Sequence, residues 1–299
     1  MKRIWQLLFL AYSPFFAGAQ DVDLDKLLDQ ETKKEMKPQT EFTIATFKSS
    51  RIANGHSVET LPGGVLDVKI SHRFGAINKG LYELFGLDNA TIRIGADYGI
   101  TDKLMVGLGR SSFEKQYDAF AKYKILQQSK GKKNMPVTLT AVGAIMYKTL
   151  KDPPDLNYTP YFTDRLFYTW QLLVARKFSE NFSFQLMPTM VHYNVASTSA
   201  IPNDLFVLGA AFRQKITKRM SVNAEYYYNF PGSKLPGTKN TLSLGLDVET
   251  GGHVFQFVFT NSTGIAERPF LTETTGSWSN GDIHFGFNIS RVFQLSKRK

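Results

Sequence analysis

The chain contains no cysteine and, after its N-terminal region, no long apolar run. The absence of cysteine excludes a disulfide framework, a thiolate metal site, a cysteine nucleophile and a cysteine-linked lipid anchor. A transmembrane helix needs about eighteen or more consecutive apolar residues, and no later stretch approaches this length. What the chain does have is glycine (23 residues) and aromatic side chains (13%), a composition that favours strands over helices.

The first nineteen residues have the features of a cleavable export signal. Lys2 and Arg3 precede an apolar run over residues 4–16, and Ala17–Gly18–Ala19 matches a small-x-small cleavage site. We therefore expect cleavage after Ala19. An uncleaved anchor helix is disfavoured because the run is too short to span a bilayer and contains a proline. An exported chain without a helical anchor is secreted, periplasmic or an outer-membrane barrel.

Short segments that alternate between apolar and polar residues repeat along the chain. In the last of them, Ile283, Phe285, Phe287 and Ile289 alternate with small or polar residues. Successive side chains of a strand point to opposite faces, so this segment predicts a strand with one apolar and one polar face. Such strands, repeated behind an export signal, are typical of a transmembrane β-barrel.

The alternation predicts an all-β, antiparallel barrel of about twelve strands. The expected strands cover residues 64–74, 91–99, 104–109, 117–125, 137–147, 166–174, 182–186, 206–212, 222–228, 242–248, 255–260 and 283–293. The segment 137–147 is apolar on both faces, so the sequence does not determine which of its residues face the lumen.

Connection lengths predict the orientation of the barrel. Short turns alternate with longer loops, and bacterial barrels have short periplasmic turns and longer external loops. This assignment places both ends of the twelve-strand series in the periplasm. A further spanning strand at Phe42–Lys48 would make the count odd, so we expect that segment to lie in the lumen, at the periplasmic rim or below the barrel. A missed strand would instead raise the count to fourteen.

These expectations divide the chain into three parts. Residues 1–19 form the export signal, residues 20–63 an N-terminal periplasmic or plug segment, and residues 64–299 the transmembrane barrel. A short helix is expected near residues 21–28, where acidic residues at its start favour the helix dipole.

Several motifs resemble those of an uncharacterised family of Bacteroidota outer-membrane β-barrel proteins. They are FKSSR at residues 47–51, NGHSVETLP at 54–62, ISHRFG at 70–75 and the closing FGFNISR at 285–291. The resemblance implies export and a barrel fold, and it brings no catalytic residue or cofactor. Because these motifs fall mainly where alternation is weak, they mark the candidate plug residues, which are Phe47, Lys48, Arg51, Asn54, His56, Ser57, Glu59, His72 and Arg73.

An enzyme that modifies lipid or lipopolysaccharide is an alternative. The chain has five histidines but no Gly-x-Ser-x-Gly or His-Glu-x-x-His motif. His56, Ser57 and Glu59 are the nearest approach to a hydrolytic set, but neighbours along a strand point apart, so a structural turn is favoured. We therefore expect no catalytic residue, no metal site and no cofactor.

Charged residues on the polar strand faces predict a charged lumen. Nine basic and six acidic residues occupy these positions. An anion-preferring pore and a sealed interior of mutually paired charges both fit, and the sealed interior is favoured. The fifteen residues are Lys69, Arg73, Arg93, Lys122, Lys124, Arg165, Lys177, Arg213, Lys215, Asp67, Asp97, Asp118, Glu225, Asp247 and Glu249.

The leading functional hypothesis is an outer-membrane channel or ligand-binding barrel. The alternatives are the lipid-modifying enzyme and a structural barrel that docks a periplasmic protein. Net charge is +10, or +8 without Lys2 and Arg3, but the basic residues are dispersed, so nucleic acid is not an expected partner. Outer-membrane lipid, a periplasmic protein and a small anionic solute are the partners considered. Trp278, in a loop rich in Thr, Ser and Gly, could stack on a sugar, although loop packing is favoured.

Overall fold

The computed structural model describes residues 25–26, 28–29, 39–152, 159–196 and 201–296. The chain divides into two units, Met1–Gln39 and Thr40–Lys299, and each is described by itself. In the first unit, the described residues from 25 to 29 are helical. The expected export signal and most of the helix expected at 21–28 lie outside the described residues.

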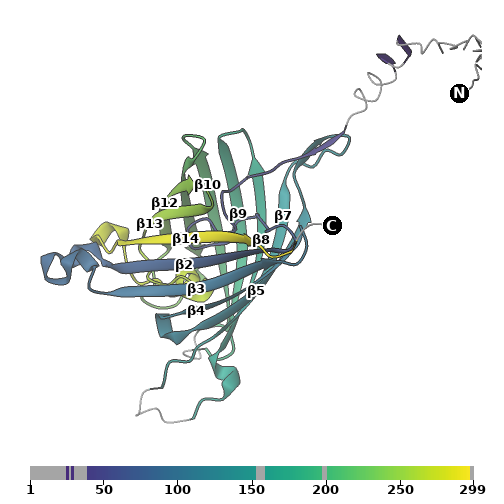
Figure 1. Cartoon of the computed structure of the whole chain (residues 1–299). Coiled ribbons are helices and arrows are strands. Elements are labelled where there is room, and N and C mark those ends of the chain that lie inside the picture. The colour runs from purple at the N-terminus through teal and green to yellow at the C-terminus, as the bar shows by residue number, and fades with distance from the viewer. Residues whose placement is uncertain (1–24, 27, 30–38, 153–158, 197–200, 297–299) are drawn as a thin grey trace, which may run out of the picture. The chain divides into compact units, whose positions relative to one another are not determined.

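The second unit is a closed antiparallel barrel of twelve strands (Figure 1). Every strand pairs with its neighbour along the barrel, and the last strand closes on the first, so no edge is left open. The predicted fold class is thus confirmed. The barrel strands are β2 (Val65–Ala76), β3 (Ala90–Gly99), β4 (Leu104–Ser111), β5 (Tyr117–Leu126), β7 (Thr138–Tyr147), β8 (Leu166–Lys177), β9 (Phe182–Tyr193), β10 (Asp204–Lys215), β11 (Met220–Asn229), β12 (Thr241–Thr250), β13 (His253–Thr260) and β14 (His284–Gln294).

Alternation along the strands separates an apolar outer face from a buried inner face. In β14, Gly286, Asn288 and Ser290 are buried, whereas the aromatic and aliphatic residues between them are more exposed. In β7, Thr138, Thr140 and Val142 point inward, which fixes the phase that the sequence left open. That strand is apolar on both faces because the lumen beside it is packed with apolar side chains.

The two ends of the barrel differ in the length of their connections. At the turn end, the connections cover residues 100–103, 127–137, 178–181, 216–219 and 251–252, and all but 127–137 are short. At the loop end, they cover 77–89, 112–116, 148–165, 194–203, 230–240 and 261–283, and all but 112–116 are longer. The loop end carries short 3₁₀ helices, which are η1 (Ile77–Lys79), η2 (Leu81–Gly86), η3 (Phe113–Lys115), η4 (Phe162–Arg165), η5 (Pro231–Ser233) and η6 (Trp278–Asn280).

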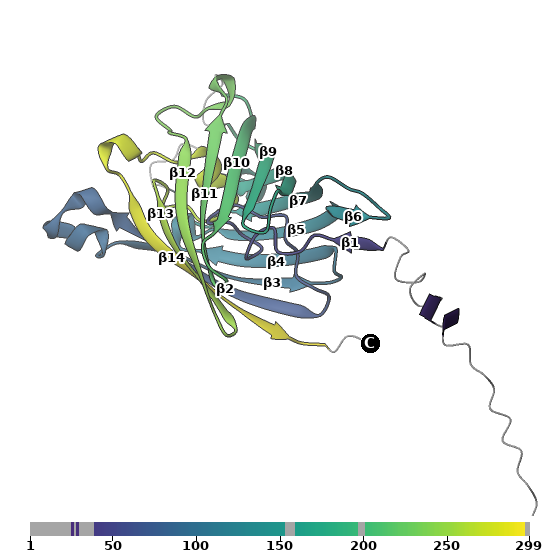
Figure 2. The same ribbon diagram turned by 90° about the horizontal axis from the view of Figure 1, so that it is seen from above.

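The chain enters the barrel at the turn end. There β1 (Thr40–Phe42) pairs with β6 (Ser129–Gly131) in a separate two-stranded sheet. Residues 43–63, called the N-terminal insert, then run inside the barrel wall before β2 begins (Figure 2). Phe47, Ile52 and Val58 of this insert are buried among side chains of the lumen. Residues 43–48 form no barrel strand, so an even count of spanning strands is retained.

A second segment fills the lumen from the loop end. Residues 261–283, called the loop insert, connect β13 to β14 and contain the helix α2 (Glu267–Thr272), all of whose residues are buried. The lengths of the connections predict this stretch only as an external loop. The difference arises because Ile265, Phe270 and Leu271 bury apolar surface that an external loop would leave in water.

The lumen is apolar on one side and polar on the other. Inward apolar side chains come from β4, β5 and β7 to β10, whereas buried charged residues come mainly from β2, β3, β5, β11 and β12. The two inserts pack between these sides. No helix among the described residues is long and apolar enough to cross a membrane.

Candidate functional site

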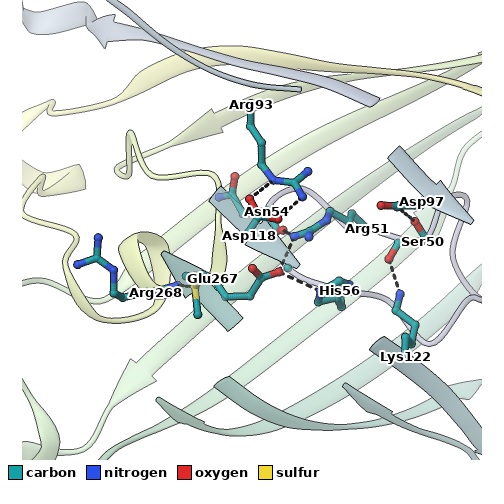
Figure 3. Close-up of polar contacts among 12 residues, drawn as sticks. Ser50, Arg51, Asn54, His56, Arg93, Asp97, Asp118, Lys122, Glu267 and Arg268 are labelled. Atoms are coloured by element: carbon teal, nitrogen blue, oxygen red, sulfur yellow. Dashed lines mark hydrogen bonds and ion pairs between the residues drawn. The ribbon is translucent and has the colours of Figure 1, made fainter. Parts of the chain in front are cut away.

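The two inserts meet at a buried charged cluster, which we call the central latch (Figure 3). Glu267 of α2 places Oε1 2.9 Å from Arg51 Nη1 and 2.9 Å from His56 Nε2, both of the N-terminal insert. Glu267 and His56 are fully buried and Arg51 is nearly so. The latch therefore joins a segment that enters at the turn end to one that enters at the loop end.

The charge states of the latch follow from its surroundings. Burial, together with the positive charges of Arg51 and Lys122, lowers the pKa of His56 to about 3, so its imidazole is neutral near pH 7. Burial alone would raise the pKa of Glu267, but the Arg51 charge and the His56 contact hold that pKa well below its usual range. The latch is thus a carboxylate–guanidinium pair with a neutral imidazole beside it.

Phe120 of β5 packs against the latch from the wall. Its ring lies 4.6 Å from the His56 ring in an edge-on arrangement and 5.5 Å from the Arg51 guanidinium carbon. An aromatic face attracts a desolvated cation, so Phe120 adds to the positioning of Arg51. Arg51 Nη1 also donates to the carbonyl of Asn54, 2.9 Å away, which closes the insert turn around the latch.

Glu225 of β11 holds the tip of this turn. Its carboxylate accepts hydrogen bonds from the backbone amides of Ala53, Asn54 and Gly55, at 3.3, 2.8 and 3.1 Å. Three amides converging on one carboxylate are a charge-assisted contact, stronger than neutral hydrogen bonds. A side chain at Gly55 would place its first carbon 1.7 Å from the Tyr227 hydroxyl oxygen, so the close approach requires glycine.

Two lysines hold the opposite side of the insert. Lys122 Nζ donates to the carbonyl oxygens of Ser50, Ser57 and Glu59, at 2.8, 3.0 and 3.1 Å. Lys69 Nζ donates to Ser50 Oγ at 2.6 Å and pairs with Asp97 Oδ2 at 2.5 Å. Carbonyl groups of the insert, which has no regular secondary structure here, are therefore satisfied by the wall rather than by water.

Polar side chains on β2, β9, β13 and β14 complete the contact. Arg73 donates to Asn54 Oδ1 at 2.7 Å, and Asn288 donates to the Ala53 carbonyl at 2.8 Å. Gln256 donates to the Ile52 carbonyl at 2.7 Å, and Gln185 both accepts from Val58 N and donates to the His56 carbonyl. The insert is thus fixed to the wall almost all the way round.

The remaining plug candidates lie at the turn-end part of the insert. Phe47 is buried, and Lys48 forms an ion pair with Glu249 of β12. Glu59 accepts from the backbone amides of Thr46 and Phe47, at 2.7 and 3.2 Å, so it ties two parts of the insert together. Ser57 donates to the carbonyl of Ser49 at 2.6 Å.

Two candidates lie elsewhere than the sequence placed them. His72 is grouped with the plug residues on motif alone, but it points outward from β2, where its ring lies 5.2 Å from that of Phe287. Strand alternation causes this, since the inward positions are taken by its neighbours. Arg165, expected in the lumen, lies in η4 before β8 begins and pairs with Asp152 of the same loop.

The other lumen candidates pair within the wall. Arg93 binds Asp118 through two side-chain contacts, one of them 3.0 Å long. Asp247 accepts from Ser221, Asn223 and Gln256, and Arg213 donates to Ser221 and to the Ala45 carbonyl. In the described part of the wall, then, these candidate charges have polar partners, whereas the Lys124 and Lys215 side chains make no described hydrogen bond or ion pair.

Sequence reasoning missed a second cluster nearer the loop end. Arg268 of α2 pairs with Glu114 and Glu273, and its guanidinium carbon lies 4.1 Å from the centre of the Phe167 ring. The available signal was the Glu267–Arg268 pair followed at once by Pro269, Phe270 and Leu271. Charge and bulk in a connection otherwise rich in Thr, Ser and Gly indicate a segment that packs rather than one that is solvated.

The histidine contacts do not assemble a hydrolytic site. In the part of the chain that the structure describes, no serine or threonine hydroxyl hydrogen-bonds to an imidazole, and no three His, Cys, Asp or Glu residues are grouped to hold a metal ion. His56 has a carboxylate beside it, but the pair is fully buried and faces a guanidinium.

A family model matches residues 47–293, which is most of the chain, and its family is described as a membrane-bound β-barrel domain, DUF5777. The chain belongs to this family. The match begins at Phe47, inside the N-terminal insert, so in this DUF5777 protein the insert is part of the domain rather than an addition to it. The expected relationship to an uncharacterised barrel family is confirmed at that level. No curated protein matches the chain.

Solved structures similar to this DUF5777 chain are also barrels. The NanC porin is 9% identical with a TM-score of 0.46, over 78% of this chain and 100% of that one. The KdgM porin is 9% identical with a TM-score of 0.46, over 77% and 99%. Outer membrane phospholipase A from Escherichia coli is 10% identical with a TM-score of 0.43, over 79% and 93%. At these identities and TM-scores the resemblance does not extend to function.

Proposed function

We propose that this protein is an outer-membrane channel whose lumen is closed by its N-terminal insert. The observation that carries the proposal is the set of contacts that hold the insert. They are hydrogen bonds and ion pairs from wall side chains, made mostly to the insert backbone, with no covalent link. Such contacts can be exchanged for water, so the insert can leave without the barrel itself being broken.

The direction of opening follows from the topology. The insert is continuous with β1 at the turn end, and with short turns in the periplasm this end faces inward. The insert would therefore be withdrawn toward the periplasm, and Glu267, on the other insert, would have to release Arg51 first. The alternative, a barrel that docks a periplasmic protein through residues 42–64, has less support because Phe47, Ile52 and Val58 of that segment are buried in the lumen.

Matched charges set the expected solute class. Lys69, Arg73 and Lys122 on the wall are accompanied by Asp67, Asp97 and Glu225, so a vacated lumen has no dominant sign. The proposal is thus a channel for small polar solutes without a charge preference. The enzyme alternative has no supporting contact, since the latch imidazole touches no nucleophile in the described chain.

A disulfide between insert and wall tests the proposal. Asn54 Nδ2 and Ser243 Oγ are 3.0 Å apart, so Asn54→Cys with Ser243→Cys should form a bond, and no native cysteine can interfere. We expect the wild type to show openings in a planar bilayer, the oxidised variant to show almost none, and reduction to restore them. The readout is open probability before and after reductant.

The matched control keeps one of the two substitutions. Ser243→Cys with Thr260→Cys links β12 to β13 within the wall, where the two hydroxyl oxygens are 2.9 Å apart, and leaves the insert free. This control should conduct as the wild type does. A wild type that never conducts, even when residues 43–63 are deleted, would overturn the channel proposal.

A further inference from the structure

The loop end of the barrel contains a pocket that the central latch does not use. Its volume is about 450 Å³, within the range of roughly 300–1,000 Å³ that small-molecule sites occupy. Its walls come from the loop insert on both sides of α2, with contributions from η3 and from the start of β14. The pocket therefore opens where the loop insert enters the lumen.

The lining is rich in groups that hydrogen-bond to neutral polar ligands. Thr263 and Thr275 bring hydroxyls that make no hydrogen bond to any other described residue, and Ser262 Oγ only accepts, from Gly264 N, so its proton is free to donate. His284 also lines the pocket, and its Nδ1 is bound to the Phe74 carbonyl at 2.9 Å. The three hydroxyls can therefore form hydrogen bonds to a ligand without breaking a bond that the fold uses.

Charge in the lining points away from anions. Neither lysine nor arginine lines the pocket, whereas Glu273 and Asp282 both do. Glu273 uses one oxygen on Arg268 and Tyr193, so its other oxygen remains available. A carboxylate can accept hydrogen bonds from two adjacent hydroxyls of a ligand, so it suits a diol. It also repels a ligand that is itself an anion.

The remaining walls add close backbone and an aromatic ring. Gly264 and Gly276 line the pocket without side chains, and Phe113 provides a ring at its edge. An aromatic ring beside hydroxyls and carboxylates fits a ring with one apolar face and several hydroxyls. Trp278, by contrast, donates Nε1 to the Leu242 carbonyl at 2.9 Å and packs within the loop, so it is not a lining residue.

We propose that this pocket binds a neutral or amino saccharide of one or two rings. The site is formed by the loop insert, so it is separate from the contacts that hold the N-terminal insert, and binding does not require the channel to open. The inference names a ligand class for the loop end of the proposed channel, but its binding test stands on its own.

Intrinsic fluorescence provides the assay for the full mature chain in detergent. Trp278 lies in the pocket-forming loop, and Trp170 points outward from β8. The probes are methyl glucoside, methyl mannoside, glucosamine and cellobiose, with glucuronate as the anionic comparison. We expect a saturable change in emission with at least one neutral or amino probe, absent in Trp278→Phe, and at least about tenfold weaker binding of glucuronate.

Matched variants locate the site. Thr263→Val with Thr275→Val removes two hydroxyls at nearly constant shape and should weaken binding about tenfold or more. Thr159→Val, an exposed threonine of the β7–β8 connection, should leave it unchanged. Equilibrium dialysis with radiolabelled probe repeats the measurement for Trp278→Phe, because that variant loses the optical signal.

Three outcomes overturn the inference. The first is that none of the probes binds by either method. The second is that glucuronate binds as tightly as the neutral probes. The third is that the valine pair binds as the wild type does. If sugar binding fails while the Asn54–Ser243 disulfide still blocks current, the channel proposal stands without this site. If binding holds but no current is ever seen, the site stands without the channel.

Discussion

Glu267 shows how much a single buried residue determines here. Its carboxylate neutralises Arg51 and contacts His56, and all three are withdrawn from water. A buried ion pair contributes little net stability, because desolvation offsets the attraction, but losing one partner leaves an uncompensated charge at a cost of about 3–5 kcal/mol. Removing one member of the latch should therefore cost more than the intact latch contributes.

His56 makes the docking of the insert sensitive to acid. Its pKa is lowered from 6.5 to about 3 in the docked insert, with Arg51, Lys122 and Glu267 facing it. Between these values a released insert binds a proton that the docked one does not, so docking weakens as pH falls below 6.5. Glu267, whose pKa is lowered in the docked insert, weakens docking only below pH 4.5, the ordinary pKa of a glutamate. Between pH 6.5 and 4.5, the pH dependence of docking therefore comes from His56.

A buried thiol can report this change. We expect Ala53→Cys, within the insert, to react faster with an organomercurial as pH is lowered from 6.5 to 4.5. Rates are divided by those of the exposed Thr159→Cys to remove the pH dependence of the reagent. When His56→Gln is added, the Ala53→Cys to Thr159→Cys rate ratio should no longer change between pH 6.5 and 4.5. A ratio that keeps its slope in that variant would assign the effect to another group.

At the scale of elements, the strands were predictable, the N-terminal insert was predictable only as one of three placements, and the loop insert was not predictable. Each strand alternates between residues that face the membrane and residues that face the lumen, so β14 and the other eleven strands could be predicted from sequence. The expectation of an even number of strands excluded residues 42–48 as a spanning strand. The loop insert has no such period. Its burial depends on side chains from strands far away in sequence, such as Met146, which contacts Arg268 N through its sulfur.

The small β1–β6 sheet is the point where the N-terminal insert is anchored at the turn end. Directly after it, Thr43 N donates to the Gln128 carbonyl at 2.8 Å. Thr43→Pro removes this donor and should loosen the entry of the insert by about 1 kcal/mol. The expected result is a several-fold faster reaction of Ala53→Cys.

A proline in another turn is the comparison for this change. Thr217 N also donates in a turn-end connection, to the Met220 carbonyl at 3.1 Å, and no described hydrogen bond joins Thr217 to the N-terminal insert. Thr217→Pro should leave the Ala53→Cys rate unaltered. Equal rates for the two proline variants would show that β1 and β6 do not restrain the insert.

For the whole molecule, connection lengths assign the two ends to opposite sides of the membrane. We expect an epitope inserted between Thr159 and Pro160, at the loop end, to bind antibody on intact cells. The same epitope between Gly251 and Gly252, at the turn end, should bind only after the outer membrane is permeabilised. The reverse pattern would invert the proposed direction of withdrawal as well.

The position of the N-terminal insert in the chain has a consequence for how the protein is made. The insert is among the first parts of the domain to be synthesised, yet Glu225, Gln256 and Asn288, which hold it, belong to the last strands. Arg51 and Glu267 are likewise separated by 216 positions along the chain. The complete set of partners for the insert therefore exists only once β14 has joined β2, and a chain truncated before that step cannot offer it.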